Sequence, residues 1–256
     1  MRVFLAMVVV LPLLAACGGT SATTDETSEL TVFAASSLTD VFTERIGPAF
    51  EAEHDGVRVV FNLGASDSLA AQIRSEGTAD VFASASGTWM DAVADDPGIT
   101  GRADFAQNRL VIVTPPGNPA GIAAIEDLSE PGVQLVLAAE GVPVGDYARE
   151  ALANAGTLDG TLANVVSNEE DNASVLAKIA AGEADAGIVY ESDVSAAAGS
   201  DVNAVEIGDD VNVIATYPIA VVSGAPSTEL AAVFVAYVTG PDGQAALASY
   251  GFDPAT

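Results

Sequence analysis

The regular alternation of strand-like and helix-like segments is the feature that most constrains what this chain can fold into. In the first third, apolar runs of strand length alternate with amphipathic segments, one of which contains Pro48 and is expected to bend there. The predicted strands are 30–35, 57–63 and 79–84, and the predicted helices are 38–53 and 69–76. Such alternation, with strands rich in Val, Ile and Phe, favours an α/β fold in which mainly parallel sheets are covered by helices.

The same pattern then restarts, which predicts two α/β lobes. The predicted strands of this second part are 109–114, 134–139, 164–167, 186–190, 211–215 and 218–222, and the predicted helices are 146–154, 173–181, 230–238 and 241–249. We expect residues 30–107 plus 218–256 to form lobe I and residues 108–217 to form lobe II. The two C-terminal helices would then pack back on lobe I.

The first residues have the pattern of an export signal. Arg2 precedes an apolar run that is too short for a permanent membrane span of ~20 residues, and Leu-Ala-Ala then leads to Cys17, the only cysteine of the chain. Residues 1–16 are interpreted as a lipoprotein signal peptide, Cys17 as the lipidated residue, and the polar residues 17–29 as a flexible tether. The alternative is an ordinary signal peptide with an unrelated cysteine. Without a second cysteine, no intrachain disulfide is inferred.

The charge of the chain excludes one class of partner. Eight Lys and Arg stand against 36 Asp and Glu, which gives a net charge of −28. Nucleic-acid binding needs basic residues and is not expected. The plain interpretation of this negative charge is that it keeps the protein soluble, for example in a salty environment. An anionic ligand also looks unfavourable at first, so an anion site needs a source of positive potential other than charged side chains.

Helix starts that follow the predicted strands offer that source. In open α/β sheets, ligands bind beyond the carboxyl ends of the strands. Converging helix N-termini form an anion site from free N–H groups and helix dipoles. The candidate segments at these strand ends are Ser36-Ser37, 64–68, 142–145, 168–172 and Tyr190. The alternative for the serines is plain helix capping, with Ser37 in a capping box, and the alternative for Tyr190 is packing.

Seven segments of the chain resemble the molybdate-binding proteins of ABC importers. They occur in order from about residue 30 to the C-terminus and include the serine turn AASSLTD, the segment GASDSLAAQI and the segment GEADAGIVYESD. The segments are 32–40, 64–73, 79–85, 108–113, 142–148, 182–193 and 217–222.

The resemblance implies a two-lobe periplasmic-binding fold of type II with the ligand in the cleft between the lobes. It implies ligand contacts from the side chains of Ser37, Ser66 and Tyr190, with Ser36 beside Ser37. It also implies contacts from two backbone amides, those of Val144 and Asn172. Many relatives have alanine and valine at these last two positions, which does not matter if only the amides are used. The implied ligand is molybdate, with tungstate of nearly the same size, and the site would bind molybdenum only as the oxyanion, without direct protein ligands to the metal.

The resemblance also implies an extracytoplasmic protein that delivers its ligand to a membrane permease powered by a cytoplasmic ATPase. We expect a monomer that is tethered through Cys17 and needs no cofactor. The lobes would close around the ligand, because donors on both lobes meet only there.

Other ligands and other classes of function remain as alternatives. Sulfate has the same charge and shape on a smaller frame, so cavity size must reject it, and phosphate needs an acceptor for its proton. Asp67 follows Ser66 where relatives have a small neutral residue, and we expect it to point outward or to cap its helix. A non-transport surface lipoprotein is a further alternative. An enzyme is not expected, because the only histidine, His54, lies in a polar turn, and neither a G-x-S-x-G motif nor a Cys/His cluster is present.

Overall fold

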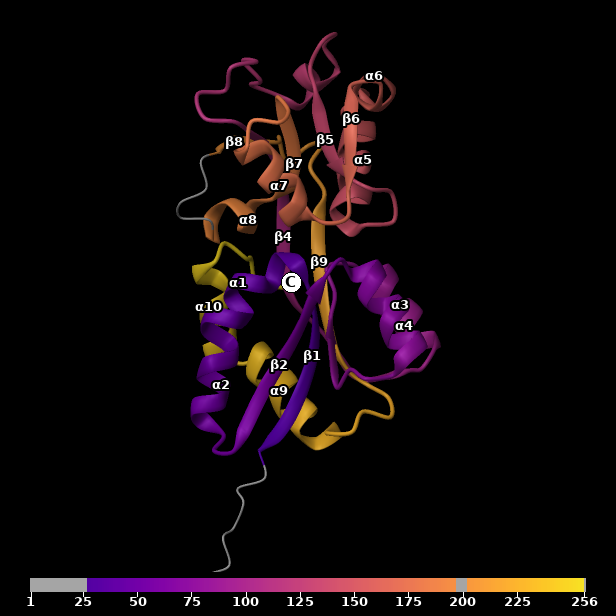
Figure 1. Cartoon of the computed structure of the whole chain (residues 1–256), viewed down its shortest axis with the longest axis vertical. Coiled ribbons are helices and arrows are strands. Elements are labelled where there is room, and N and C mark those ends of the chain that lie inside the picture. The colour runs from indigo at the N-terminus through magenta and orange to yellow at the C-terminus, as the bar shows by residue number, and fades with distance from the viewer. Residues whose placement is uncertain (1–26, 197–201, 256) are drawn as a thin grey trace, which may run out of the picture.

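The computed structural model describes residues 27–196 and 202–255, which form two α/β lobes joined by two long strands (Figure 1). The predicted signal peptide, Cys17 and most of the predicted tether lie outside the described residues. The element order confirms the alternation of strands and helices, and the fold class is the predicted one. No helix within the described ranges is long and apolar enough to cross a membrane.

The sheet of lobe I has the strand order β2-β1-β3-β9-β4. β1 runs parallel to β2 and β3, whereas β9 is antiparallel to β3 and β4. All three parallel strands therefore end at the same edge of the sheet, which faces lobe II. The strands are β1 (Ser28–Ala35), β2 (Val57–Gly64), β3 (Val81–Ala83), β4 (Ile99–Thr114) and β9 (Ile214–Val222).

Helices cover both faces of this sheet because its strands are apolar on both sides. Val32 of β1 belongs to the larger core cluster, and its neighbour Phe33 belongs to a second cluster on the opposite face with Leu69 and Met90. Figure 1 shows α3 and α4 on one side and α2 and α10 on the other. The helices of lobe I are α1 (Thr39–Val41), α2 (Gly47–Glu53), α3 (Ser66–Glu76), α4 (Gly87–Asp95), α9 (Thr228–Thr239) and α10 (Pro241–Ser249).

The sheet of lobe II begins where β4 leaves lobe I. The last five residues of β4 pair with β7 and β8, and the strand order is β8-β4-β7-β5-β6, with β5, β6 and β7 parallel. The carboxyl ends of β5, β6 and β7 therefore also share one edge. The elements are β5 (Leu135–Ala138), β6 (Val165–Glu169), β7 (Ala186–Tyr190), β8 (Asn203–Glu206), α5 (Pro143–Asn154), α6 (Leu158–Leu162), α7 (Asn172–Ala180), α8 (Glu191–Ala196) and the 3-10 turn η3 (Ile125–Ser129).

The helix predicted at 38–53 is not continuous. A 3-10 turn η1 (Ser36–Leu38) leads into α1, and the π-helical turn η2 (Phe42–Ile46) separates α1 from α2. Pro48 follows this turn and cannot donate to the carbonyl four residues earlier, which is a known cause of such irregularities. Gly47 also approaches Phe61 of β2 so closely that a Cβ would lie 2.7 Å from its ring. The predicted bend is thus a π-helical turn.

Several elements differ from the sequence prediction in extent or were missed, among them the short elements η3, α6, α8 and β8, which were not predicted. β4 begins at Ile99, ten residues before the predicted strand, because its polar first part pairs with β9 across two register shifts. The two extended segments predicted around Pro218 are one strand, β9, which begins at Ile214. Pro218 is tolerated beside a register shift, and its carbonyl accepts from the Ser84 N–H at 2.9 Å. Helix α4 was not predicted, although Ser86 caps it by accepting from the Thr88 N–H.

Candidate functional site

A small cavity between the lobes brings together all six candidate residues from the sequence. Its volume is about 10 Å³, far below the roughly 300–1,000 Å³ of sites for drug-sized ligands, so only a very small ligand fits. The lining comes from the ends of β1, β2 and β3 on lobe I and from the starts of α5 and α7 and the end of β7 on lobe II. The lining residues are Ala35, Ser36, Ser37, Gly64, Ala65, Ser66, Ala85, Val142, Pro143, Val144, Asn172 and Tyr190.

Among the described residues, neither Lys nor Arg lines this cavity, so any positive potential must come from backbone N–H groups and helix dipoles. Ser66 is the first residue of α3, Asn172 is the first of α7, and Val144 is the second of α5. N–H groups in the first turn of a helix lack intrahelical acceptors and lie at the positive end of its dipole. Three helix starts therefore present free N–H groups to this space, which is the chemistry of an anion site.

The capping alternative does not hold for Ser37 or Ser66. Both lie inside their helical turns, the caps being Ala35 and Ala65, and neither hydroxyl bonds a first-turn N–H. The buried Ser66 Oγ instead accepts from the Ala85 N–H at 3.0 Å. With its oxygen occupied in this way, the Ser66 O–H is free to donate toward the cavity.

Two buried tyrosines pack against each other beside the cavity, and only one has a hydroxyl partner. The Tyr190 and Tyr217 rings pack edge to face, with an interplanar angle of 66° and centroids 5.9 Å apart. Tyr217 Oη lies 2.9 Å from Ser37 Oγ and accepts a longer bond of 3.4 Å from Asn108 Nδ2. Tyr190 Oη is buried without a hydrogen-bond partner in the described part of the chain. Burial raises the pKa of both phenols, so both remain protonated donors.

Gly145 explains how the start of α5 comes so close to the strand it follows. A Cβ at this position would lie 2.3 Å from the Ala139 carbonyl oxygen and 2.5 Å from that of Ala138, within the range that no side chain tolerates. The close approach sets the position of the neighbouring Val144 N–H in the cavity wall. Glycine here is required by contact, not by a left-handed backbone.

Hydrogen bonds between the lobes show that the cleft is closed in this structure. Trp89 Nε1 on α4 donates to the Gly141 carbonyl oxygen at 2.9 Å, and Tyr147 Oη on α5 donates to the Ala85 carbonyl oxygen at 3.3 Å. The Ser36 hydroxyl also bonds the side-chain oxygen of Asn172 across the cleft. The two lobes thus meet on several sides of the cavity.

Asp67 does not line the cavity. We expected Asp67 to point outward or to cap its helix, and only the second alternative is wrong, because Ala65 occupies the cap and no side-chain capping bond forms. Asp67 instead lies in the first turn of α3, where its charge is favourable to the helix dipole. Its Oδ1 is buried and has no partner within the described ranges.

The His54 ring stacks on Phe50 at the end of α2 and bonds the Phe50 carbonyl oxygen, which is a structural role.

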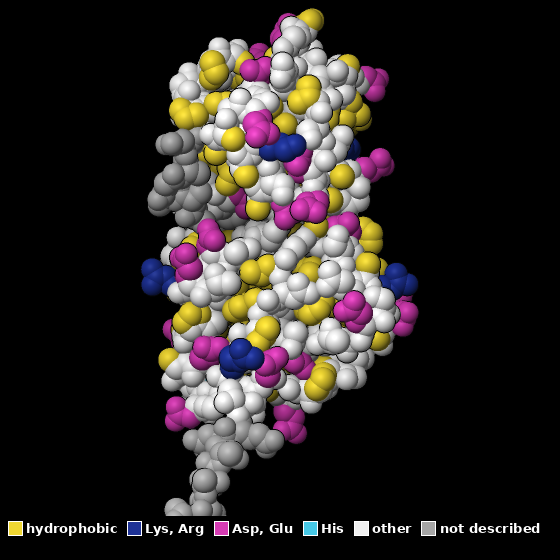
Figure 2. Space-filling model, in the orientation of Figure 1, with side chains coloured by type: hydrophobic (Ala, Val, Ile, Leu, Met, Phe, Trp, Pro, Cys, Tyr) yellow, Lys and Arg dark blue, Asp and Glu magenta, His cyan; other side chains and the backbone are white. Residues whose placement is uncertain are grey.

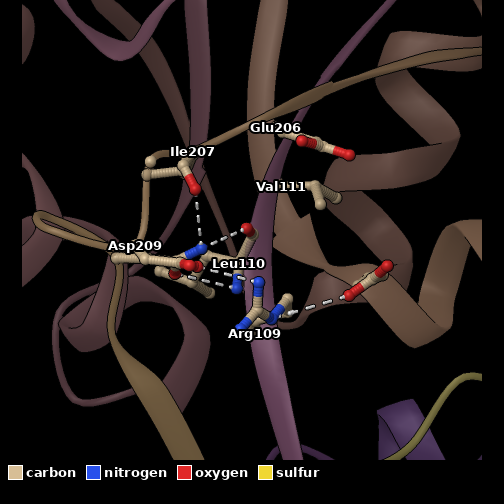
Figure 3. A pocket seen from close by; sticks show the side chains of 9 residues that line it. Arg109, Leu110, Val111, Glu206, Ile207 and Asp209 are labelled. Carbon is tan, nitrogen blue, oxygen red and sulfur yellow. Dashed lines mark hydrogen bonds and ion pairs between the residues drawn. The ribbon is translucent and has the colours of Figure 1, made fainter.

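A larger pocket of about 420 Å³ beside β4 does not have the chemistry of an anion site (Figure 3). Its only cationic side chain, Arg109, bonds Asp209 at 3.0 Å and lies 3.9 Å from Glu191. Glu206 adds another carboxylate to the lining. No group of three or more potential metal ligands occurs in the described part of the chain. The positive charge of this pocket is therefore already neutralised.

Comparison with known proteins assigns the family. The family described as bacterial extracellular solute-binding protein matches residues 30–253. This chain belongs to that family. The molybdate-binding protein ModA of Mycobacterium tuberculosis is 38% identical over 246 residues, covering 93% of this chain and 92% of its own length. ModA of Escherichia coli is 36% identical over 232 residues, covering 88% of each chain. The resemblance stated from the sequence is thereby confirmed.

A solved structure agrees in fold. The periplasmic molybdate-binding protein of Azotobacter vinelandii superposes with a TM-score of 0.76, at 20% identity, over 89% of this chain and all of its own. The two-lobe periplasmic-binding fold predicted from the sequence is therefore confirmed.

Sequence reasoning missed the residues that support the site from behind. Tyr217 holds the Ser37 hydroxyl, Asp193 accepts from the Asn172 side chain at 2.7 Å, and Trp89 bridges the solute-binding protein's two lobes. Tyr217 and Asp193 lie inside segments that carried the family resemblance, but nothing in their spacing indicated a partner 180 or 21 residues away. Their roles depend on tertiary contacts.

Proposed function

We propose that this solute-binding protein captures molybdate, and tungstate with it, in the cavity between the lobes and delivers the ion to an ABC importer. The observation that carries the proposal is the convergence of serine hydroxyls, one unpartnered tyrosine hydroxyl and three helix starts on a cavity without charged side chains. Molybdate and tungstate at neutral pH only accept hydrogen bonds, and a shell made of donors satisfies them.

The proposed donors are the hydroxyls of Ser37, Ser66 and Tyr190 and the N–H groups of Val144 and Asn172, with Ser36 beside them. Donors of lobe I and lobe II meet only around the ion, so binding favours the closed form. The proposed lobe boundaries, 107/108 and 217/218, fall within β4 and β9, the two strands that run between the lobes. A delivered ion would then leave when the permease opens the cleft.

Phosphate is disfavoured because no carboxylate lines the cavity to accept its proton. Sulfate remains the second candidate, since it differs from molybdate in size and not in hydrogen bonding. The curated relatives at 36–38% identity bear the name of molybdate-binding proteins, which favours the larger ion.

Thermal unfolding of the purified protein with each of four ions tests this proposal. A ligand at 100 times its Kd stabilises the native state by ~2.7 kcal/mol, whereas an ion that does not bind leaves the unfolding temperature unchanged. Molybdate and tungstate should raise the unfolding temperature, and sulfate and phosphate at the same concentration should not. A shift with phosphate or sulfate but not with molybdate would contradict the proposal.

Lipidation of Cys17 is proposed as the membrane tether. The support is the Leu-Ala-Ala-Cys sequence after an apolar run, together with a polar segment of about ten residues before β1 begins at Ser28. Cys17→Ser should move the protein from the membrane fraction to the soluble fraction of cells that express it. An unchanged distribution would mean that Cys17 is not the anchor.

A further inference from the structure

A chain of hydrogen bonds leads from the cavity to a carboxyl group that the ligand shell does not use. The Ser36 hydroxyl bonds Asn172 Oδ1, and Asn172 Nδ2 donates to Asp193 Oδ1 at 2.7 Å. The second carboxyl oxygen, Asp193 Oδ2, accepts from the Tyr190 N–H at 3.0 Å. Asp193 thus holds two residues of the cavity wall and reaches a third, Ser36, through Asn172.

The surroundings of Asp193 disfavour its negative charge. With Ser36, Ser37 and Asn172 it lines a pocket on the flank of the cavity, to which α1 contributes Asp40 and which neither Lys nor Arg lines. Asp171, the cap of α7, adds a further negative charge from that helix. Burial is the largest cause of a rise in the pKa of Asp193 to about 7. The hydrogen bonds from the Tyr190 N–H and from Asn172 lower this pKa, and the carboxylates of Asp171 and Asp40 raise it.

The other ionisable groups around Asp193 do not neutralise it. Tyr190 on β7 and Tyr217 on β9 are phenols whose pKa values are raised by burial, so they are uncharged. On its own helix, Glu191 is 3.9 Å from Arg109, which is also bound to Asp209. Lys178, toward the far end of α7, pairs with Glu169 at 2.7 Å and donates to Ser167. Within residues 27–196 and 202–255, no Lys or Arg is therefore paired with the Asp193 carboxylate.

The protonation state of Asp193 determines the direction of the whole chain of hydrogen bonds. An ionised carboxylate only accepts, so Asn172 must turn its NH₂ group toward Asp193 and its oxygen toward Ser36. The Ser36 proton is then held by Asn172 and cannot be donated into the cavity. A protonated Asp193 can donate, so the Asn172 amide can turn over, offer its oxygen to Asp193 and its NH₂ group to Ser36 Oγ, and free the Ser36 proton for an anion.

We propose that Asp193 is a positioning residue that couples anion binding to the uptake of one proton and determines, through Asn172, whether Ser36 donates to the bound oxyanion. The inference rests on the proposed capture of a dianion in the cavity. The proton comes from solvent and is held on the Asp193 carboxyl group. A dianion nearby disfavours the carboxylate further, so the proton uptake and the additional Ser36 hydrogen bond both favour binding at low pH.

The expected pH dependence follows from the pKa of the free protein. Below about pH 7 Asp193 is already protonated, and the affinity for the dianion is constant. Above this pH, each binding event must also take up a proton from solvent, so the affinity falls by up to tenfold per pH unit until the pKa of Asp193 in the complex is reached. Asp193 thus makes this site weaker in alkaline medium.

Isothermal titration of the full-length protein with molybdate from pH 6 to pH 9, at constant ionic strength, tests the inference. Buffers with different ionisation enthalpies count the protons taken up. We expect about one proton per ion at pH 8 and an affinity at least tenfold higher at pH 6.5 than at pH 8.5. Binding of equal affinity at every pH without proton uptake would overturn the inference and leave the proposed function standing. Absence of binding at every pH would overturn both.

Three variants separate this role from a merely structural one. Asp193→Asn keeps the shape of the side chain but cannot titrate, so its affinity should not change with pH. Asp40→Asn removes a neighbouring charge outside the chain of hydrogen bonds and should keep the wild-type slope. Ser36→Ala should weaken binding at pH 6 more than at pH 8.5, because wild-type Ser36 donates only at low pH. An equal loss at both pH values would contradict the relay, and this test remains available if Asp193→Asn does not fold.

Discussion

The two tyrosines that pack edge to face beside the cavity, Tyr190 and Tyr217, allow a sharp prediction, because a phenylalanine substitution removes only the hydroxyl oxygen from each. Tyr190→Phe removes a buried hydroxyl that has no partner in the described structure, whereas Tyr217→Phe removes one that is bonded to Ser37 at 2.9 Å and to Asn108 at 3.4 Å. The ring contact of 5.9 Å between them is preserved in both variants. The ligand-free protein and the complex should therefore respond in opposite ways.

The magnitudes follow from the hydrogen bonds lost. In the ligand-free protein, Tyr190→Phe should leave the free energy of unfolding unchanged or raise it by up to ~1 kcal/mol, since an unsatisfied buried hydroxyl is unfavourable. Tyr217→Phe should lower it by ~0.5–1.5 kcal/mol, which corresponds to a fall of roughly 1–6 °C in Tm for a chain of this size. For molybdate, Tyr190→Phe loses a hydrogen bond to a charged ligand, about 1.5–3 kcal/mol or roughly 10- to 150-fold in Kd.

Urea unfolding without ligand and isothermal titration with molybdate measure the two quantities on the same protein samples. Tyr217→Phe is the matched control for a hydroxyl that supports Ser37 and does not itself face the ligand. A Tyr190→Phe variant that is destabilised as much as Tyr217→Phe and binds molybdate with wild-type affinity would refute the assignment of Tyr190 as a ligand donor.

Three further predictions concern closure, charge and backbone contact. Trp89 is the only tryptophan and bonds Gly141 across the cleft, so its fluorescence should change on molybdate binding, and Trp89→Phe should weaken binding by ~0.5–1.5 kcal/mol in a titration. Asp40, Glu170 and Asp171 line pockets that adjoin the cavity, and Figure 2 shows that acidic side chains are more frequent than basic ones on the face in view. The association rate measured by stopped flow should therefore rise with salt, and a rate that falls would indicate an unrecognised cation. Gly145→Ala should destabilise the start of α5 and abolish binding in the same titration, because its Cβ would meet two carbonyl oxygens, and wild-type affinity would contradict that contact.

Protonation of Asp193 should also affect the stability of the ligand-free protein. Its pKa in the folded state, about 7, is above the value of 3.8 in a model compound, so the native state holds the proton more tightly. The stabilisation is complete below about pH 4 and is lost as pH rises through 7. Wild-type Tm should thus fall from pH 5 to pH 8 by more than that of Asp193→Asn, as followed by calorimetry. Parallel curves would contradict the shifted pKa.

The sequence predicted the part of the site that depends on strand ends and helix starts. Ser66, Val144 and Asn172 each follow a strand in a repeated pattern, and parallel strands bring such positions to one edge, so their meeting in one cavity could be inferred from order alone. The family resemblance added the choice among neighbouring residues, such as Ser66 rather than Ser68. Together these sources placed six residues in the cavity wall.

The remaining parts depend on contacts that a linear pattern does not contain. The first ten residues of β4 are too polar to indicate a strand, and they become one because β9 is available to pair with them. The chain from Ser36 to Asp193 requires the lobes to close, which places residues 157 positions apart in one hydrogen-bonded line. The absence of Asp67 from the cavity is likewise set by its place in the first turn of α3 and could not be fixed from its neighbours in the sequence.

The claim that a dianion is held without positive side chains is tested most directly by a crystal structure of the protein with molybdate. The account predicts one ion between the lobes, with hydrogen bonds of about 2.7–3.1 Å to the hydroxyls of Ser37, Ser66 and Tyr190 and to the amides of Val144 and Asn172. It also predicts that the nitrogen atoms of all Lys and Arg side chains lie beyond contact distance. An ion bound by Arg109 or another cation, or a molybdate found outside this cavity, would contradict the account.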